Sequence, residues 1–294
     1  MKKKIKPRKW VKVSILAAGI LGIFGAANCE THDNEAIASE NKKTDAAKRD
    51  FINDHIVKKE KLPAALYPKI SSLASQQVRL KPSIEDYGGS KTVYLTFDDG
   101  PDQHSMKLLK ILDHYHAKAT FFLLDPNIKK HQNIVREMHK RGHSLGLHGV
   151  SHNAHLIYRS KETVVAEMKQ DQQTLRAVTG VTTHLIRTPY GSSPYMKPAY
   201  MKAVQQNGFK LWDWSIDSED WQCRNGQYVS NVEKQLKQHN FKTIPNVILM
   251  HEKPSTYQYL PKLLSYLQKN GYTFESIKDD MVPYHFKAKM PAKS

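Results

Sequence analysis

Cysteine is scarce in this chain of 294 residues, which contains only Cys29 and Cys223. A disulfide framework is therefore excluded as the basis of the fold, and Cys223 is interpreted as a structural or incidental thiol. Repeated long apolar runs are also missing. The hydrophobic content of 39% and the mean hydropathy of −0.60 exclude a polytopic membrane protein. The length is sufficient for one large domain with appendages.

Acidic residues are few, with 28 against 45 lysines and arginines, so that the formal net charge is +17. A basic surface favours polyanions such as nucleic acid, anionic lipid or a bacterial cell wall. No nucleic-acid-binding motif is recognisable, so we expect a wall or membrane surface as the partner and no nucleic acid. Part of the excess charge precedes the first acidic residue: Lys2, Lys3, Lys4, Lys6, Arg8, Lys9 and Lys12.

The basic start is followed by an apolar segment, residues 13–27, that is too short to span a bilayer comfortably. A basic region before a short apolar core is typical of secretory signals. We therefore expect residues 1–28 to be a signal peptide cleaved before Asn28 or a retained membrane anchor, with lipidation at Cys29 as a third alternative. The protein is expected to be exported and to be secreted, wall-associated or anchored at the outer face of the cytoplasmic membrane. Membrane contact is expected only through this segment.

Three further parts follow the leader. Residues 29–90 are rich in charge and poor in apolar side chains at first, which predicts a polar tether and a short N-terminal cap. Residues 91–280 carry the strand and helix patterns of the main domain, and residues 281–294 form a basic tail. No internal repeat is visible.

Strand-like and helix-like patterns alternate along the main domain. Strands are predicted at 93–97, 119–124, 144–148, 185–186, 210–215, 247–250 and 272–277. Helices are predicted at 106–115, 128–140, 161–178, 196–206, 229–239 and 260–269. About seven such units imply an α/β fold with parallel strands and outer helices. In an α/β barrel the carboxyl ends of the strands share one face, where an active site is expected.

Two adjacent carboxylates, Asp98 and Asp99, end the first strand before the Gly100-Pro101 breaker. Neighbouring side chains at a strand end point in different directions, so one can hold a metal while the other holds a proton. Taken alone, the pair is also compatible with an ordinary turn. His148 and His152 follow the third strand four positions apart, and with one Asp they form a set that suits zinc or a similar divalent ion. The alternative for the pair is two surface histidines.

Three other strand ends carry candidate residues. Pro189 and Gly191 bracket Tyr190, whose backbone amide is therefore expected to be free to bind an oxyanion. Arg187 could clamp a carboxylate, or be a surface arginine at a strand exit. His251 ends an apolar strand and is a candidate general acid, or a structural histidine. The run 212–221 combines aromatic and acidic residues as in a sugar groove, although its tryptophans could be core residues.

Together these five motifs, in this order, resemble the polysaccharide deacetylase family, that is, the NodB-homology domain of carbohydrate esterase family 4. The resemblance covers residues 91 to about 280 and implies a distorted (β/α)7 TIM-like barrel. It implies Asp98 as the base, Arg187 as the residue that orients it, and His251 as an acid tuned by Asp217. It further implies the metal ligands Asp99, His148 and His152, an oxyanion site at the Tyr190 amide, and a pocket for the acetyl methyl lined by Trp221 and Leu249.

The resemblance implies a metal-dependent hydrolase that removes N-acetyl groups from a cell-wall glycan, and it is greatest to peptidoglycan N-acetylglucosamine deacetylases of Gram-positive bacteria. Chitin oligomers, muramic acid residues and acetyl-xylan are alternative substrates, and a non-catalytic wall-binding protein is an alternative of another class. One divalent ion is expected, zinc first, with cobalt, nickel or manganese as alternatives, in a monomer. Three residues depart from the family pattern and bear on pocket shape: Gly149, Thr188 and Glu252.

Overall fold

The computed structural model describes residues 82–238 and 244–286, which belong to one compact unit. The predicted leader, the tether as far as residue 81 and residues 287–294 of the tail lie outside the described residues. The domain boundaries given above therefore remain predictions. Within the described ranges, no helix is both long and apolar enough to cross a membrane.

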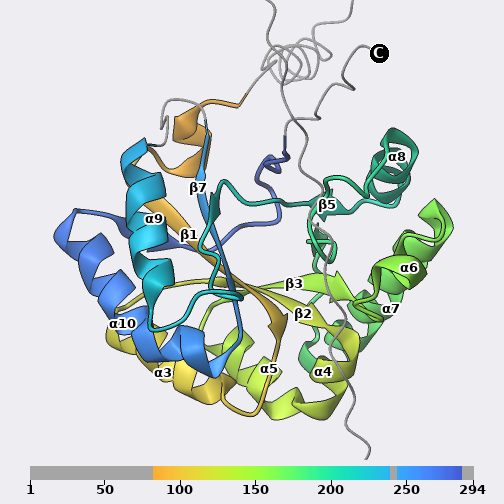
Figure 1. Cartoon of the computed structure of the whole chain (residues 1–294). Coiled ribbons are helices and arrows are strands. Elements are labelled where there is room, and N and C mark those ends of the chain that lie inside the picture. The colour runs from red at the N-terminus through yellow and green to blue at the C-terminus, as the bar shows by residue number, and fades with distance from the viewer. Residues whose placement is uncertain (1–81, 239–243, 287–294) are drawn as a thin grey trace, which may run out of the picture. The chain divides into compact units, whose positions relative to one another are not determined.

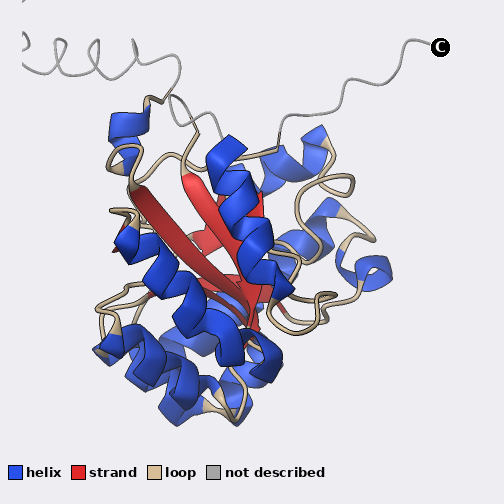
Figure 2. Cartoon of the chain, turned by 60° about the vertical axis from the view of Figure 1, so that its left-hand side comes forward, coloured by secondary structure: helices blue, strands red, loops and turns tan. Residues whose placement is uncertain are grey.

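A curled parallel sheet with helices around its outer side forms the domain (Figures 1 and 2). Its described strands are β1 (Thr92–Gly100), β2 (Thr120–Leu124), β3 (Ser144–Gly149), β4 (Leu185–Ile186), β5 (Lys210–Leu211), β6 (Ile216–Asp217), β7 (Asn246–His251) and β8 (Thr273–Glu275). Their order is β5-β4-β3-β2-β1-β7-β6, with β8 beside the start of β1. Within the described residues β5 and β6 do not pair, so the barrel is open. The prediction of a distorted α/β barrel is confirmed.

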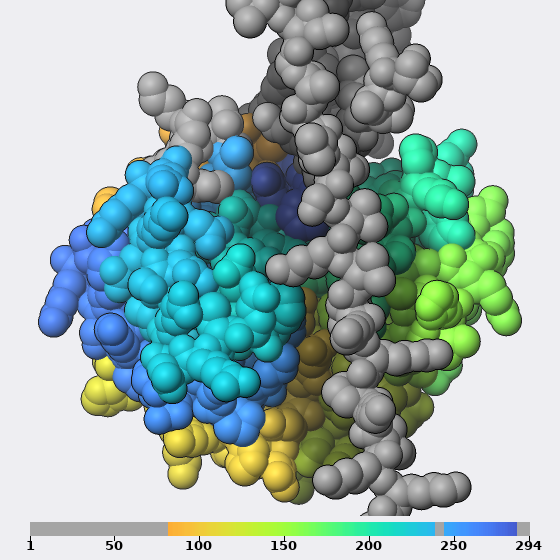
Figure 3. All heavy atoms as spheres, in the orientation of Figure 1, coloured from red at the N-terminus to blue at the C-terminus, as the bar shows by residue number. Residues whose placement is uncertain are grey.

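Helices connect the strands and cover them from outside. They are η3 (Ile84–Tyr87), α3 (Ser105–His114), α4 (Asp125–Lys130), α5 (Gln132–Lys140), α6 (Ala154–Ile157), α7 (Lys161–Thr179), α8 (Pro198–Gln206), α9 (Gln227–Gln238) and α10 (Pro254–Lys269). In the space-filling view, α9 and α10 form one flank of the molecule, and the green helices from α6 to α8 form the other (Figure 3).

The local sequence explains most of these bounds, and the exceptions are informative. Ser160 begins α7, where its hydroxyl accepts a hydrogen bond from the Thr163 amide, and Gly180 ends it with a left-handed φ of 77°. The helix predicted at 128–140 is instead two helices that meet at His131. The strand predicted at 210–215 pairs only at its first two residues, and a second short strand, β6, follows it.

The two faces of β1 bury different kinds of side chain. Val93, Leu95 and Phe97 point outward into the main core beneath the helices. The alternate residues point into the barrel, where Tyr94 joins a smaller apolar cluster around Trp212. The same alternation directs Thr96 and then Asp98 into the interior, so the polar end of the strand lies at the carboxyl face of the barrel.

Segments outside the repeating pattern also pack on the barrel. The ring of Tyr87, in η3, meets Trp212 edge to face with centroids 6.5 Å apart. At the other end of the described chain, the amide of Phe286 donates to Asp213, and its ring packs against Trp214 at 4.8 Å. Residues as far as 286 therefore contribute to the structure around the cavity described next.

Candidate active site

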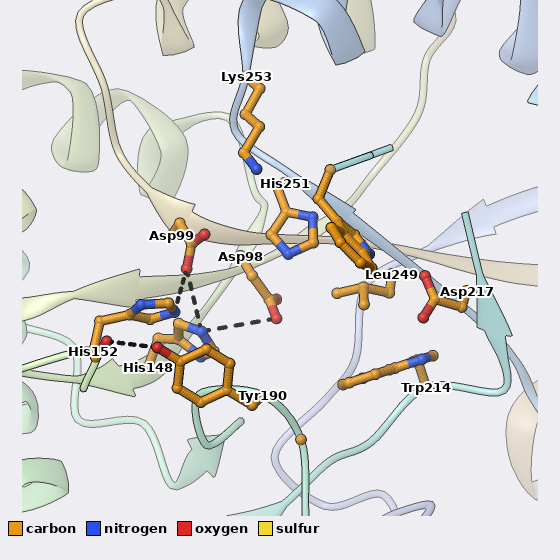
Figure 4. Close-up of a pocket in the computed structure, with 12 residues that line it drawn as sticks. Asp98, Asp99, His148, His152, Tyr190, Trp214, Asp217, Leu249, His251 and Lys253 are labelled. Carbon is orange, nitrogen blue, oxygen red and sulfur yellow. Dashed lines mark hydrogen bonds and ion pairs between the residues drawn. The ribbon is translucent and has the colours of Figure 1, made fainter. Parts of the chain in front are cut away.

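A cavity of about 430 Å³ opens at the carboxyl ends of the strands (Figure 4). Its volume is in the range of sites that bind small ligands. Of the ten site residues predicted from sequence, nine line it, and Arg187 lies buried directly behind them. The lining residues are Asp98, Asp99, His148, His152, Tyr190, Gly191, Trp214, Asp217, Trp221, Leu249, His251 and Lys253.

Asp99, His148 and His152 converge on one point at the edge of the cavity. The Asp99 Oδ1 atom lies 3.4 Å from His148 Nε2 and 3.0 Å from His152 Nε2, and one ligand atom from each residue lies within 4.8 Å of the others. Local backbone geometry produces this convergence. The register of β1 against β2 shifts between Asp98 and Gly100, and Asp99 and His152 adopt left-handed φ values of 70° and 44°.

The chemistry of these atoms fits a divalent cation. His148 donates its Nδ1 proton to the carbonyl of Arg187 at 2.6 Å, which leaves the lone pair of Nε2 directed at the site. Asp99 Oδ1 is buried, and the nearest polar atoms to it are the Nε2 atoms of the two histidines. Burial would raise the pKa of Asp99, but the two histidines hold it well below its usual range. Lone pairs that face one another in this way are satisfied by a cation, and two histidines with a carboxylate suit zinc and related ions.

Two carboxylates of α7 hold the loop that carries both histidines. Asp171 accepts the backbone amides of His148 and Gly149 at 3.0 and 2.9 Å. Glu167 accepts the amides of Val150 and Ser151, both at 2.9 Å. Neither acid was predicted as a site residue, although their spacing of four positions on one helix face could have indicated a pair facing inward.

Asp98 is held by a buried ion pair. Its Oδ1 accepts a hydrogen bond of 2.9 Å from Arg187, whose side chain is fully buried. The same guanidinium group donates to Thr96 Oγ1 and to the carbonyls of Trp212 and Asp213. Its position is therefore fixed by several partners, and Asp98 in turn is fixed beside the three metal-ligand candidates. Thr96 was missed from sequence, although it lies two residues before Asp98 on the same face of β1.

His251 lies across the cavity from this group, and its partner differs from the predicted one. Its Nδ1 is 2.7 Å from Oδ1 of the buried Asp220, which also accepts the His251 amide. The expectation that Asp217 tunes this histidine is corrected: the Asp217 carboxylate accepts the amide of Glu219 instead. Burial would lower the pKa of His251, but the bond to Asp220 and the negative charge around the cavity raise it.

The remaining predicted residues shape the opening. Tyr190 has a left-handed φ of 66°, and its amide donates to no acceptor within the described residues. Its hydroxyl donates to the carbonyl of His152 at 3.0 Å, while half of the residue stays exposed. Trp221 is also exposed, and Leu249 is buried at the cavity wall. Of the two tryptophans with open assignments, Trp212 is core and Trp214 lines the cavity.

Comparison with known proteins was made by sequence and by structure. Residues 85–212 match the model of the polysaccharide deacetylase family. YheN of Bacillus subtilis strain 168 is 46% identical over 199 residues, which are 67% of this chain and 71% of that protein. A peptidoglycan-N-acetylglucosamine deacetylase of Bacillus cereus is 36% identical over 220 residues, 72% of this chain and 80% of that protein.

The fold is shared with a solved structure. The crystal structure of the polysaccharide deacetylase Bc1974 from Bacillus cereus superposes with a TM-score of 0.61 and 35% sequence identity, and the match covers 67% of this chain and 97% of that one. Sequence, fold and the convergence of the motif residues therefore agree. This chain belongs to the polysaccharide deacetylase family, carbohydrate esterase family 4, among relatives named peptidoglycan N-acetylglucosamine deacetylases.

Proposed function

We propose that this protein hydrolyses the N-acetyl group of N-acetylglucosamine in peptidoglycan, releasing acetate and leaving a free amine on the sugar. The observation that carries the proposal is the meeting of a complete set of groups in one cavity: a fixed carboxylate, a possible metal site and a paired histidine. These groups match the three tasks of amide hydrolysis. The carboxylate can accept a proton from water, the metal site can stabilise the oxyanion, and the histidine can give a proton to the amine.

Asp99, His148 and His152 would hold one divalent ion, zinc first and cobalt, nickel or manganese as alternatives. When bound, such an ion polarises a carbonyl group and lowers the pKa of water. The protein's part is to fix the three ligands: the Arg187 carbonyl orients His148, and the α7 carboxylates hold the loop to His152.

The other residues move protons and hold the substrate. Asp98 takes the proton of the attacking water, and the hydrogen bond from Arg187 fixes the orientation of its carboxylate. The free amide of Tyr190 donates to the oxyanion, a contact that is typically worth about 3 kcal/mol or more in the transition state. His251, kept protonated by Asp220, gives its proton to the departing nitrogen. Leu249 and Trp221 form the wall against which the acetyl methyl lies.

We further propose that the protein is exported and works on the wall as a monomer, with membrane contact only through residues 1–28. This part of the proposal is supported by the basic and apolar pattern of the leader and by the positive charge of the chain. Fractionation of cells that express the full chain, with mass analysis of its mature N-terminus, tests it. Recovery of the intact chain in the cytosol would contradict it.

The experiment for the reaction is mass spectrometry of purified wall fragments before and after incubation with metal-loaded protein. We expect each converted N-acetylglucosamine to become lighter by about 42 Da, because hydrogen replaces an acetyl group, and an equal amount of free acetate to appear. Chelation of the metal should abolish both the mass change and the acetate. Asp98→Asn should keep the metal content and the unfolding temperature while losing the product. Asp279→Asn, at an exposed carboxylate paired with His184, is the matched control. Turnover by Asp98→Asn at the normal rate would refute the assignment of the base.

A further inference from the structure

Lys253 lines the cavity without a partner for its charge. In Figure 4 its side chain extends toward the cavity on the side of His251, and the residue is partly buried. Within the described residues, this ammonium forms no ion pair or hydrogen bond. The other charged groups of the cavity have partners: Asp98 with Arg187, Asp99 with the two histidines, Asp217 with the Glu219 amide and His251 with Asp220.

The backbone holds Lys253 in a fixed place. Its amide donates to the carbonyl of His251 at 2.9 Å, and its own carbonyl accepts the amides of Thr256 and Tyr257 in the first turn of α10. It also precedes Pro254, which favours the extended φ and ψ of −133° and 145° seen there. The stem of the side chain therefore starts from a defined point, two residues from the proposed acid.

An ammonium group that lines a cavity without an ion-pair partner is available to bind an anion of a ligand. The sugar that would be deacetylated is neutral, so it offers no charge to Lys253. In peptidoglycan, however, each N-acetylglucosamine is linked to a muramic acid unit, which carries a carboxylate on its lactyl group or on the peptide attached to it. Chitin has no such group. The unpaired ammonium thus distinguishes the two kinds of polymer by charge.

We propose that Lys253 binds a carboxylate carried by the muramyl unit next to the N-acetylglucosamine in the cavity. It is a specificity-determining residue that selects an anionic glycan over an uncharged one. This inference rests on the proposed function of the same site. It concerns substrate choice, and so it can fail while the deacetylase activity stands.

The test compares Lys253→Met and Lys253→Arg with the wild type on three soluble substrates. These are chitotetraose, a peptide-free tetrasaccharide of alternating N-acetylglucosamine and muramic acid, and the same tetrasaccharide with its stem peptides. Lys262→Met, at an exposed position of α10, is the matched control. Acetate release gives kcat and KM. Calorimetric titration of the three glycans into proteins that also carry Asp98→Asn measures binding without turnover.

We expect Lys253→Met to lower kcat/KM for a muramyl substrate about tenfold more than for chitotetraose, which corresponds to about 1.4 kcal/mol. The change should lie mainly in KM and in the titrated affinity, and Lys253→Arg should restore most of it. The wild-type preference should weaken as salt is added. A loss confined to the peptide-free substrate identifies the lactyl carboxylate as the partner, and a loss confined to the peptide-bearing one identifies the stem peptide.

The proposal is overturned if Lys253→Met lowers binding and kcat/KM by the same factor on charged and uncharged glycans, or if Lys262→Met has an equal effect. Failure of the proposed function has a different signature, because the wild type would then release no acetate from any of the three substrates. The binding titrations still decide the role of Lys253 in that case.

Discussion

Glu252 is expected to make the stability of the protein depend on pH in an unusual direction. Its side chain is 6% exposed, one oxygen bonds the hydroxyl of Ser105 and the other has no partner within the described residues. The carboxyl group occupies the space where Gly100 has no side chain, since a Cβ at that glycine would overlap it. Burial, together with the nearby charge of Asp102 and of the two aspartates that end β1, raises the pKa of Glu252 to about 8, against the weaker opposing effect of the Ser105 bond.

The sign follows from proton binding. Between the unfolded value of 4.5 and about 8, the folded state holds a proton on Glu252 that the unfolded state has lost. The contribution of this group to stability is therefore fully present below pH 4.5 and is lost as pH rises toward 8. The slope is about 1.4 kcal/mol for each pH unit, so that a rise from about pH 5 to about pH 8 costs about 4 kcal/mol.

Glu252→Gln removes the titration and keeps the shape of a protonated carboxyl group. Urea unfolding of metal-loaded protein at several pH values gives the free energy of unfolding of both forms. The variant should be close to the wild type at about pH 5 and more stable by about 4 kcal/mol at about pH 8. Glu275→Gln, at an exposed glutamate of β8, is the matched control. A stability difference between Glu252→Gln and the wild type that does not change with pH would refute the reasoning.

Two further predictions concern the buried charges of the cavity. Arg187→Met leaves the buried carboxylate of Asp98 without its cation and should lower the free energy of unfolding by about 3–5 kcal/mol in urea. A loss below about 1 kcal/mol, typical of a surface pair, would contradict the buried ion pair. Asp220→Asn removes the partner that raises the pKa of His251, so the alkaline limb of the kcat–pH profile should move down by about one pH unit. Asp217→Asn should move that limb less, and an equal shift in both variants would show that the histidine has no preferred partner.

The sequence was sufficient for the metal-ligand candidates because parallel strands bring their carboxyl ends to one face. Asp99 and the two histidines each lie at or just after the carboxyl end of a strand, so the fold brings them to the same face. The sequence was not sufficient to identify the carboxylate that pairs with His251. Asp217 and Asp220 lie in one loop three residues apart, and only the backbone path after β6 decides which carboxylate reaches the ring.

Other misses have equally local causes. No glycine or proline interrupts residues 128–140, so the sequence shows no break, yet the chain turns at His131 and begins a second helix. Lys253 belongs to no recognisable motif and was not predicted as a site residue. Its importance depends on a direction in space, toward the cavity, that a pattern of residue types cannot give.

One residue joins two tasks in this site. The guanidinium of Arg187 donates a hydrogen bond to the carboxylate of Asp98, the proposed base. The backbone carbonyl of Arg187 accepts a hydrogen bond from the imidazole of His148, a metal-ligand candidate. Both hydrogen bonds therefore depend on the backbone directly after β4, a strand of only two residues. A shift of the backbone at this strand end would therefore displace the partners of Asp98 and of His148 together.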